Sequence, residues 1–263
     1  MTEQKEKKLN IFRGIDDYDA YQLQEIRLGL EKDLDVSRYT NPRFSHFQME
    51  QIRLGLESHL TVEQINSYRD VHFAPEKMEQ IRIAFEEGSD ITPYIKNHFS
   101  WIKLREIRLG LWYKTVDVSL YATNLHDWEQ MKQVRLGLTS GVDVSIYNKP
   151  TIYDHLQMKV IRIGLEKGLD VSKYNQVYQT VNPLKHRKSM TKALFSSFQM
   201  EQIMEGLEHN VSVSIYSKPE FDFMQMKQIR LGLEKGIDVS VYALPSIPAD
   251  EMKIYRIKSM NQE

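Results

Sequence analysis

An arginine recurs at nearly regular intervals along the chain, and its guanidinium group has the strongest capacity for binding chemistry in this sequence. A planar guanidinium binds a carboxylate or a phosphate through two parallel hydrogen bonds, whereas a lysine acts as a point charge. No lysine stands at the equivalent place in any copy, which indicates that the planar fork matters. The recurring arginines are Arg27, Arg53, Arg82, Arg108, Arg135, Arg162, Arg230 and Arg256, and Met204 takes this place in one copy.

Two interpretations of these arginines are open. In the first, each arginine pairs with a glutamate four residues later in the same helix, or bonds groups of an adjoining repeat, and so holds successive repeats together. In the second, the arginines form an exposed stripe that contacts phosphates or the acidic side chains of a partner. The glutamate is present in five copies and the chain has a formal net charge of −1, so we favour the first interpretation.

A glycine lies two residues after most of these arginines, and a tyrosine ends most copies. Because a glycine inside a helix costs about 1 kcal/mol relative to alanine, its recurrence indicates the close approach of a neighbouring helix, with approach of a ligand as the alternative. Ala84 in the third copy indicates a limit on side-chain size. We expect the tyrosines to pack with their hydroxyls at the surface; base stacking is the alternative. The tyrosines are Tyr39, Tyr68, Tyr94, Tyr121, Tyr147, Tyr174, Tyr216 and Tyr242.

Catalytic and metal-binding patterns are not found in the sequence. The eight histidines are scattered, no HExxH, GxSxG, Walker A or GxGxxG pattern occurs, and there is no cysteine. Thiolate catalysis, disulfides and cysteine-based zinc sites are therefore excluded. The acidic residues recur at equivalent places, where helix capping or a solvated face explains them. We expect a protein that is not an enzyme and that binds no metal and no cofactor.

The recurring residues belong to a repeat of about 26 residues. QEIRLGLEKDLDVSRY (24–39) returns as KVIRIGLEKGLDVSKY (159–174) and KQIRLGLEKGIDVSVY (227–242), with weaker copies elsewhere. Met49, Ile52 and Leu56 show the apolar stripe of an amphipathic helix. A glycine that favours left-handed backbone follows the helix in four copies, and an aspartate then predicts the N-cap of a short helical segment. These glycines are Gly88, Gly141, Gly168 and Gly236.

The predicted fold is all-α, an α-solenoid of about nine repeats, each with a long helix, a tight turn and a short helical segment. A single repeat of this length cannot bury its own apolar face, so the repeats must stack. We divide the chain into a polar N-terminal cap (1–20), repeats one to six (21–174), an inserted basic connector (175–197), and repeats seven to nine with a C-terminal cap (198–263).

The composition of the chain bears on its partners and on its location in the cell. The near-neutral net charge argues against a generic nucleic-acid binder, although a local basic stripe remains compatible with it. No run of apolar residues is long enough to span a membrane, and the polar N-terminus MTEQKEKKLN lacks the apolar core of a signal peptide. We therefore expect a cytoplasmic protein with no membrane partner.

Two departures from the repeat are candidate partner-binding sites. The first is aromatic and lies in and after the fourth repeat, where Trp112 replaces the usual glutamate; an exposed tryptophan there could be a binding hot spot, or it could fill space left by a longer turn. The second is the insertion, whose basic window is either a solvated connector or a contact for an acidic partner or a nucleic-acid backbone. The candidate residues are Trp101, Trp112, Tyr113, Trp128, Lys185, His186, Arg187, Lys188 and Lys192.

The pattern IRxGLExGxDVSxYxxPxF resembles that of a family of short helical-repeat proteins of Gram-positive bacteria and their phages, plasmids and conjugative elements. The resemblance extends from about Tyr21 to Tyr255, and IRLGLEKGIDVSVY (229–242) is its clearest copy. It implies the repeat architecture but no activity and no catalytic residues. Met204 and the insertion depart from the pattern, so stacking could be interrupted there.

Three functions are consistent with these features. The leading hypothesis is a non-catalytic scaffold that binds a protein, and the mobile-element context suggests an inhibitor of a host defence complex such as a CRISPR effector. The alternative is a binder of nucleic acid or a nucleoprotein through the arginine stripe and the 182–192 window, with affinity that falls steeply with salt. The third, a small-molecule enzyme, would require a deep pocket.

Overall fold

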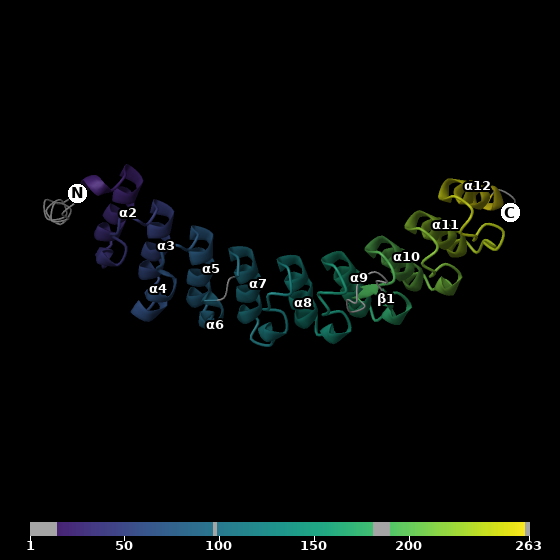
Figure 1. Ribbon diagram of the computed structural model, residues 1–263, viewed down its shortest axis with the longest axis horizontal. Coiled ribbons are helices and arrows are strands. Elements are labelled where there is room, and N and C mark those ends of the chain that lie inside the picture. Colours follow the sequence, from purple (N-terminus) through teal and green to yellow (C-terminus); the bar gives the residue numbers. More distant parts are fainter. Residues whose placement is uncertain (1–14, 97–98, 181–189, 261–263) are drawn as a thin grey trace. The chain divides into compact units, whose positions relative to one another are not determined.

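The structure is a computed structural model that describes residues 15–96, 99–180 and 190–260. The described chain is mostly helical, which confirms the all-α class (Figure 1). It divides into two compact units, Met1–Asn124 and Leu125–Glu263.

The first unit contains four long helices, each followed by a turn and a short helical segment in the described chain. In chain order its elements are the 3₁₀ turn η1 (Ile15–Asp17), α2 (Ala20–Glu31), η2 (Val36–Arg38), α3 (His46–Glu57), α4 (Val62–Tyr68), α5 (Pro75–Glu86), α6 (Thr92–Ile95), α7 (Trp101–Trp112) and η3 (Val118–Leu120).

The second unit contains five long helices in the described chain. Its elements are α8 (Trp128–Ser140), η4 (Val144–Ile146), α9 (His155–Glu166), η5 (Val171–Lys173), the strands β1 (Val177–Thr180) and β2 (Met190–Ala193), α10 (Ser197–Glu208), η6 (Val213–Ile215), α11 (Phe223–Glu234) and α12 (Ala249–Met260).

Local sequence explains where most of the long helices begin. A serine or aspartate before the helix accepts a hydrogen bond from the backbone N–H of the third helical residue, which is a glutamine. The glutamine side chain accepts in return from the backbone N–H of the capping residue, as in Asp222 and Gln225, where the two distances are 2.8 and 2.9 Å. This reciprocal capping box satisfies two amide groups that the first turn would leave unpaired.

The ends of the helices follow the predicted chemistry. Gly88, Gly141, Gly168 and Gly236 have φ between 69° and 74°, which confirms the left-handed termination. Asp33, His59 and Asn210 adopt the same backbone region in other repeats, at φ of 54°, 59° and 56°. Aspartates then accept from the backbone two residues on, as Asp143 does from Ser145 N–H at 3.0 Å, and they start the short segment.

Consecutive long helices pack side by side within each unit, and the side chains between them form the core. The fourth and seventh residues of each long helix supply most of this core: Met131, Met158 and Met226 are fully buried, as are Ile161 and Ile229. Burial of each such side chain stabilises the fold by about 1.5–3 kcal/mol. The assignment of the recurring methionines to the core is therefore confirmed.

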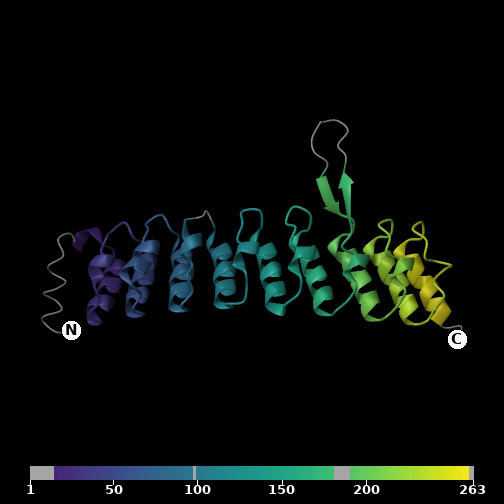
Figure 2. The ribbon, with the colours of Figure 1, turned by 90° about the horizontal axis from the view of Figure 1, so that it is seen from below.

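The inserted segment carries the one pair of strands that the structure describes. β1 and β2 pair antiparallel, with Tyr178 opposite Lys192, and Leu194 N–H donates to the Gln176 carbonyl at 2.8 Å at their base. This ribbon projects away from the helices of its unit (Figure 2). The helices α9 and α10 on either side of the insertion nevertheless contact each other directly. The insertion therefore does not interrupt helix packing, and its strands are a feature that the all-α prediction omitted.

No helix among residues 15–96, 99–180 and 190–260 is long and apolar enough to cross a membrane.

Candidate functional site

The repeated arginines lie at the eighth position of the long helices, and six of them donate to a side chain of the preceding helix of the same unit. Arg82 Nε donates to Oε1 of Gln51 at 3.1 Å, and Arg162 Nε donates to Oε1 of Gln133 at 3.1 Å. Arg53 makes the equivalent bond to a carboxylate, with Nε 2.7 Å from Oε2 of Glu25. The same bond recurs for Arg108 with Gln80, Arg230 with Gln202 and Arg256 with Gln228.

In five of these six arginines a glutamate binds the other half of the guanidinium, whereas Arg256 Nη1 lies 3.9 Å from Met260 Sδ. Arg82 and Arg162 bind the glutamate four residues later at 2.7 and 2.6 Å, and Arg53 and Arg230 make the same pair. Arg108, which has Trp112 four residues later, binds Glu87 of the preceding repeat at 2.7 Å.

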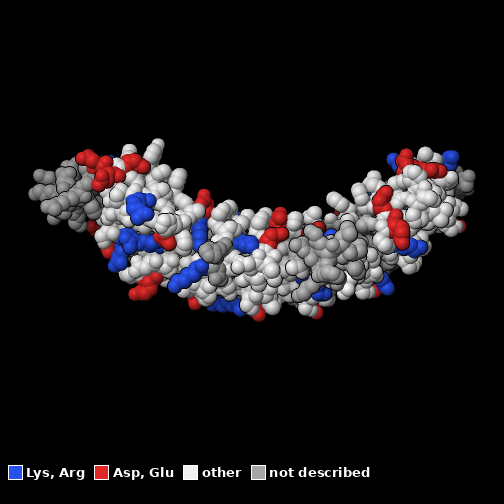
Figure 3. Space-filling view, in the orientation of Figure 1, with Lys and Arg blue, Asp and Glu red and all other residues white. Residues whose placement is uncertain are grey.

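These paired arginines expose only 7–13% of their side chains. Arg135 is buried, whereas Arg27, in the first long helix described, is exposed. Most of the guanidinium groups therefore hold neighbouring helices together, as the first interpretation predicted, and they are not free to bind a phosphate backbone. On the face in Figure 3, basic and acidic side chains are interspersed among the described residues of each unit.

Glutamines at two helix positions complete this network, and sequence reasoning missed both positions; α3, α8, α10 and α11 have a glutamine at each. The glutamine at position six accepts the arginine Nε. The glutamine at position three, besides closing the capping box, donates to backbone carbonyls that lead into the next helix: Gln48 Nε2 lies 2.7 Å from the Phe73 carbonyl, and Gln130 Nε2 lies 2.8 Å from that of Tyr153. The Ser/Asp-x-x-Gln pattern at the start of six of the long helices was the available signal.

One interface replaces the polar pair by an apolar pair. Between α9 and α10, Met204 stands in place of the arginine and Val160 in place of the glutamine, and both are buried. The two departures compensate each other, because a buried glutamine amide facing a methionine would lose its hydrogen bond. Met204 is therefore a repacked contact and not an interruption of the stack.

The helical glycines provide space for the tyrosine of the same repeat. A Cβ built on Gly137 would lie 1.9 Å from the Tyr147 hydroxyl, and the other helical glycines give 1.8–2.1 Å. The Tyr147 hydroxyl donates to the Gln133 carbonyl at 3.0 Å. The size limit is thus confirmed, but the approaching group is a tyrosine and not a neighbouring helix. Where Ala84 replaces the glycine, Tyr94 is only half-buried.

The expectation that the tyrosine hydroxyls lie at the surface is wrong, because most of these side chains are fully buried. The hydroxyl of Tyr216, for example, donates to the Gln202 carbonyl at 3.0 Å inside the fold. Burial raises the pKa of Tyr147 and Tyr216, because it disfavours the charged phenolate. These rings are packing elements and are not available for base stacking.

The candidate aromatic residues do not all come together. Trp112 and Tyr113 form an edge-to-face pair, with ring centroids 4.9 Å apart, and both are exposed, at 54% and 38%. Trp101 is 39% exposed but begins the helix α7 that Trp112 ends, so about 16 Å of helix separates their backbones. Trp128 belongs to the second unit, where it begins α8.

Most of the basic candidate window lies outside the described residues, namely Lys185, His186, Arg187 and Lys188. Lys192 is described, and it is an exposed residue of strand β2.

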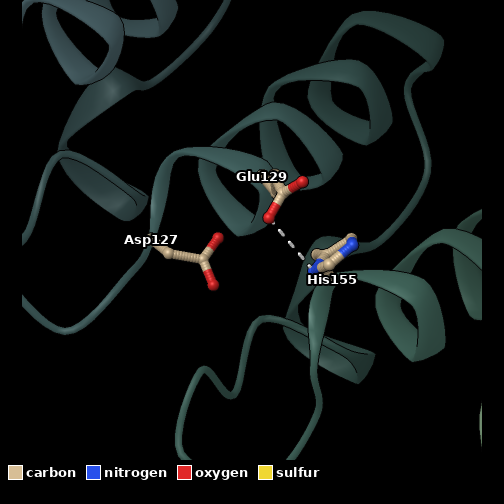
Figure 4. Close-up of side chains that lie close together, drawn as sticks. All are labelled: Asp127, Glu129 and His155. Atoms are coloured by element: carbon tan, nitrogen blue, oxygen red, sulfur yellow. Dashed lines mark ion pairs between the residues drawn. The ribbon is translucent and has the colours of Figure 1, made fainter.

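A group of metal-compatible side chains occurs where α8 and α9 begin (Figure 4). Asp127, Glu129 and His155 each place one ligand atom within 4.8 Å of the others, and His155 Nδ1 lies 3.4 Å from Glu129 Oε2. Asp127 already caps α8 by accepting from Gln130 N–H at 2.7 Å. Helix capping and a surface ion pair account for these contacts. Asp127 and Glu129 are two residues apart, but His155 lies 26 residues after Glu129, in the next long helix, so the sequence spacing gave no signal of the group.

Each unit carries exposed large apolar side chains at one recurring helix position, which sequence reasoning missed; we call these side chains the exposed row. The row occupies the second position of several long helices. The rings of Tyr21 and Phe198 also contact the first residue of the next helix, His46 and Phe223, with ring centroids 5.1 and 5.2 Å apart. The most exposed members of the row are Tyr21 at 69%, Phe47 at 55%, Phe198 at 54%, Met224 at 44% and Leu156 at 42%. Position two varies strongly between repeats, and Glu76, Ile102, Glu129 and Asp250 occupy it elsewhere.

A cavity of about 210 Å³ lies beside this row in the first unit. Phe47 and Gln51 of α3 line it on one side, and Pro75, Glu76 and Glu79 of α5 line it on the other. A second cavity of about 190 Å³ opens between Ser67, Asp70, Phe73, Thr92, Ile95 and Lys96. Both have smaller volumes than the pockets of about 300–1,000 Å³ that enclose whole small molecules.

Comparison with protein families, with curated proteins and with solved structures finds no match to this chain.

Proposed function

We propose that the protein is a non-catalytic scaffold, an α-solenoid of about nine repeats of about 26 residues, that binds a protein partner. Side-by-side packing of consecutive helices within each unit supports this architecture, because each repeat buries its apolar face only against its neighbours. Such arrays present long surfaces and not single deep pockets, which suits the binding of macromolecules.

The observation that carries the proposal is the division between inward and outward positions. Certain helix positions keep the same residue type in most repeats: glutamine at positions three and six, arginine at position eight and glycine at position ten. These side chains, and the tyrosine of the turn, make contacts within and between the repeats. Position two is exposed, is often aromatic or aliphatic, and differs between repeats. Exposed large apolar side chains on a scaffold of this kind are typical of a protein-binding surface.

The pattern of perturbed groups supports a non-enzymatic role. The largest pKa shifts fall on the buried repeat tyrosines, whose pKa values burial raises. These groups are distributed evenly along the repeats and do not converge on one cavity. Catalytic groups with perturbed pKa values usually cluster in a single cleft.

Because the repeat resembles that of proteins from phages and mobile elements, we further propose that the protein inhibits a host defence complex such as a CRISPR effector. The test is an interference assay in bacteria that carry an active CRISPR system, with and without the expressed protein. Loss of interference supports the proposal, and undiminished interference counts against this role.

The protein partner itself is tested by affinity purification from a bacterial lysate. The variant Phe47→Ser/Phe198→Ser removes two exposed rings from the row, and we expect it to lose a partner that the natural protein retains. The matched control Val62→Ser/Val241→Ser changes residues of similar exposure, 45% and 62%, that lie outside the row. Equal recovery with both variants would refute the assignment of the row as the binding surface.

Nucleic-acid binding is the alternative, and the exposed Lys192 of strand β2 supports it through the basic 182–192 segment. The repeated arginines give this alternative little support, because most of them pair with glutamates. It predicts an affinity that falls steeply with salt and is lost when lysines of this segment are replaced by glutamine. A gel-shift series over salt concentration tests this alternative.

A further inference from the structure

The cavity between α3 and α5 differs in chemistry from the equivalent place in the second unit. Phe47 forms its apolar wall, and two carboxylates, Glu76 and Glu79, stand opposite. Between α10 and α11 the same helix positions hold Phe198 facing Phe223, with ring centroids 5.2 Å apart, and Lys227. Only the first of these two places combines an exposed ring with acidic groups.

The two carboxylates have no cationic partner among the described residues. Glu76 and Glu79 occupy positions two and five of α5, so their side chains share one face of the helix. Like charges at this spacing repel each other, and a bound cation relieves the repulsion. The nearest repeat arginine, Arg82, is already held by Gln51 at 3.1 Å and by Glu86 at 2.7 Å.

The apolar part of the cavity suits the aliphatic stem of a long cationic side chain. Phe47 is 55% exposed, its ring centroid lies 4.0 Å from that of His46, and Tyr21 lies 5.1 Å from His46 on the other side. Pro75 adds an aliphatic surface across the cavity. A guanidinium stacks on an aromatic ring and also binds carboxylates through its planar fork, which an ammonium does less well.

We propose that this cavity is a docking site for an arginine side chain of the protein partner, with its stem against Phe47 and Pro75 and its guanidinium on Glu76 and Glu79. The volume of about 210 Å³ accommodates one side chain and not a whole small molecule. The inference rests on the proposed protein-binding function and adds the chemistry of the partner: a basic segment with neighbouring apolar residues that contact the exposed row.

The test uses a defined probe, the acetylated heptapeptide Gly-Ser-Leu-Arg-Leu-Ser-Gly, and its counterpart with citrulline in place of arginine. The full chain, labelled with ¹⁵N, is titrated with each peptide, and amide chemical shifts are followed. We expect the arginine peptide to shift amides of α3 and α5 around the cavity, and the citrulline peptide, which has lost only the charge, to bind about tenfold more weakly.

Two variants and one control decide where the peptide binds. Glu76→Gln/Glu79→Gln and Phe47→Ala should each weaken binding about tenfold, because they remove the charge and the ring respectively. Tyr178→Ala removes an exposed ring (44%) from strand β1, outside the exposed row, and should leave binding unchanged. All these side chains are at the surface, and circular dichroism verifies that each variant is folded.

Several results would overturn the inference: equal binding of the two peptides, shifts located away from α3 and α5, or undiminished binding by the double glutamine variant. The outcome is separable from that of the proposed function. If the peptide fails but the lysate partner is still lost in Phe47→Ser/Phe198→Ser, the protein-binding row stands and only the arginine site is wrong.

Discussion

Replacing Gly137 by alanine tests the closest contact in the repeat. An alanine Cβ would lie 1.9 Å from the Tyr147 hydroxyl, so the tyrosine would have to withdraw by more than 1 Å. Overpacking of this kind costs about 1–3 kcal/mol, and the lost hydrogen bond to the Gln133 carbonyl costs about 1 kcal/mol. Helix propensity favours the alanine by about 1 kcal/mol. We therefore expect a net destabilisation of roughly 1–3 kcal/mol.

A double-mutant cycle with Tyr147→Phe isolates the contact. Without the hydroxyl, the nearest atoms to the new Cβ are Val144 Cγ1 at 3.1 Å and the ring carbon Cζ at 3.2 Å, which small movements can accommodate. In this background Gly137→Ala should be neutral or should stabilise by up to about 1 kcal/mol. The expected coupling energy is thus about 1–4 kcal/mol, above the deviation of about 0.3–0.5 kcal/mol that independent sites show.

The assay is guanidinium chloride unfolding of the four proteins, together with hydrogen exchange of the α8 amides to locate the effect in this repeat. Gly141→Ala is the control, because Gly141 has φ of 74° and nothing within 4 Å of an added Cβ. It should destabilise by about 1–2 kcal/mol through the backbone alone, whether or not Tyr147 keeps its hydroxyl. The reasoning is refuted if Gly137→Ala stabilises the natural protein by about 1 kcal/mol, or if it shows no coupling to Tyr147.

Four further changes test other parts of the structure. Met204→Arg and Val160→Gln should each destabilise the fold by about 1–3 kcal/mol. The double variant restores the usual arginine–glutamine pair and should have nearly the stability of the natural protein. If chemical unfolding shows that the two losses add, the pairing of these positions is contradicted. Gln225→Ala removes two bonds to the carbonyls of the turn before α12 and one capping bond, and should cost about 2 kcal/mol in the same assay. Burial raises the pKa of repeat tyrosines such as Tyr147 and Tyr216, so the folded state keeps protons that the unfolded state loses above pH 10. Stability should therefore fall as pH rises beyond 10, by about 1.4 kcal/mol per tyrosine per pH unit. Phenolate absorbance that reaches the value for all 14 tyrosines near pH 10 without unfolding would contradict this. A chelator should leave the unfolding midpoint of the natural protein unchanged. Added Zn²⁺ should likewise leave the unfolding midpoint of the natural protein and of His155→Ala unchanged. A rise of the midpoint with Zn²⁺ that occurs in the natural protein and is absent in His155→Ala would contradict the expectation of no metal.

The local structure of each repeat could be predicted from the sequence because short-range rules determine it. The amphipathic stripe of 48–57, the left-handed glycine at Gly141 and the aspartate cap at Asp143 each depend on residues a few positions apart. The same residues occur in register in several copies, so each copy supports the prediction for the others. This reasoning predicted the helices and their ends, and it placed the methionines in the core.

The candidate sites could be predicted less well, because they depend on contacts between repeats. Arg82 and Gln51 are 31 residues apart, and no pattern within one repeat connects them. The compensation of Met204 by Val160 is visible in the sequence only once the pairing of positions six and eight is known. The grouping of Phe47 with Glu76 and Glu79 likewise arises only when α3 and α5 lie side by side.

The sequence by itself therefore determined the period, the helical class and the identity of the residues that recur, since these follow from backbone preferences and spacing. Tertiary structure alone decided what those residues do. Whether a guanidinium serves a partner or the fold depends on which groups surround it, and here a neighbouring helix supplies a glutamine to Arg82 and Arg162. It also decided which residues remain outside: with the arginines and tyrosines engaged within the helix stack, the exposed row and the acidic cavity beside Phe47 remain available for binding.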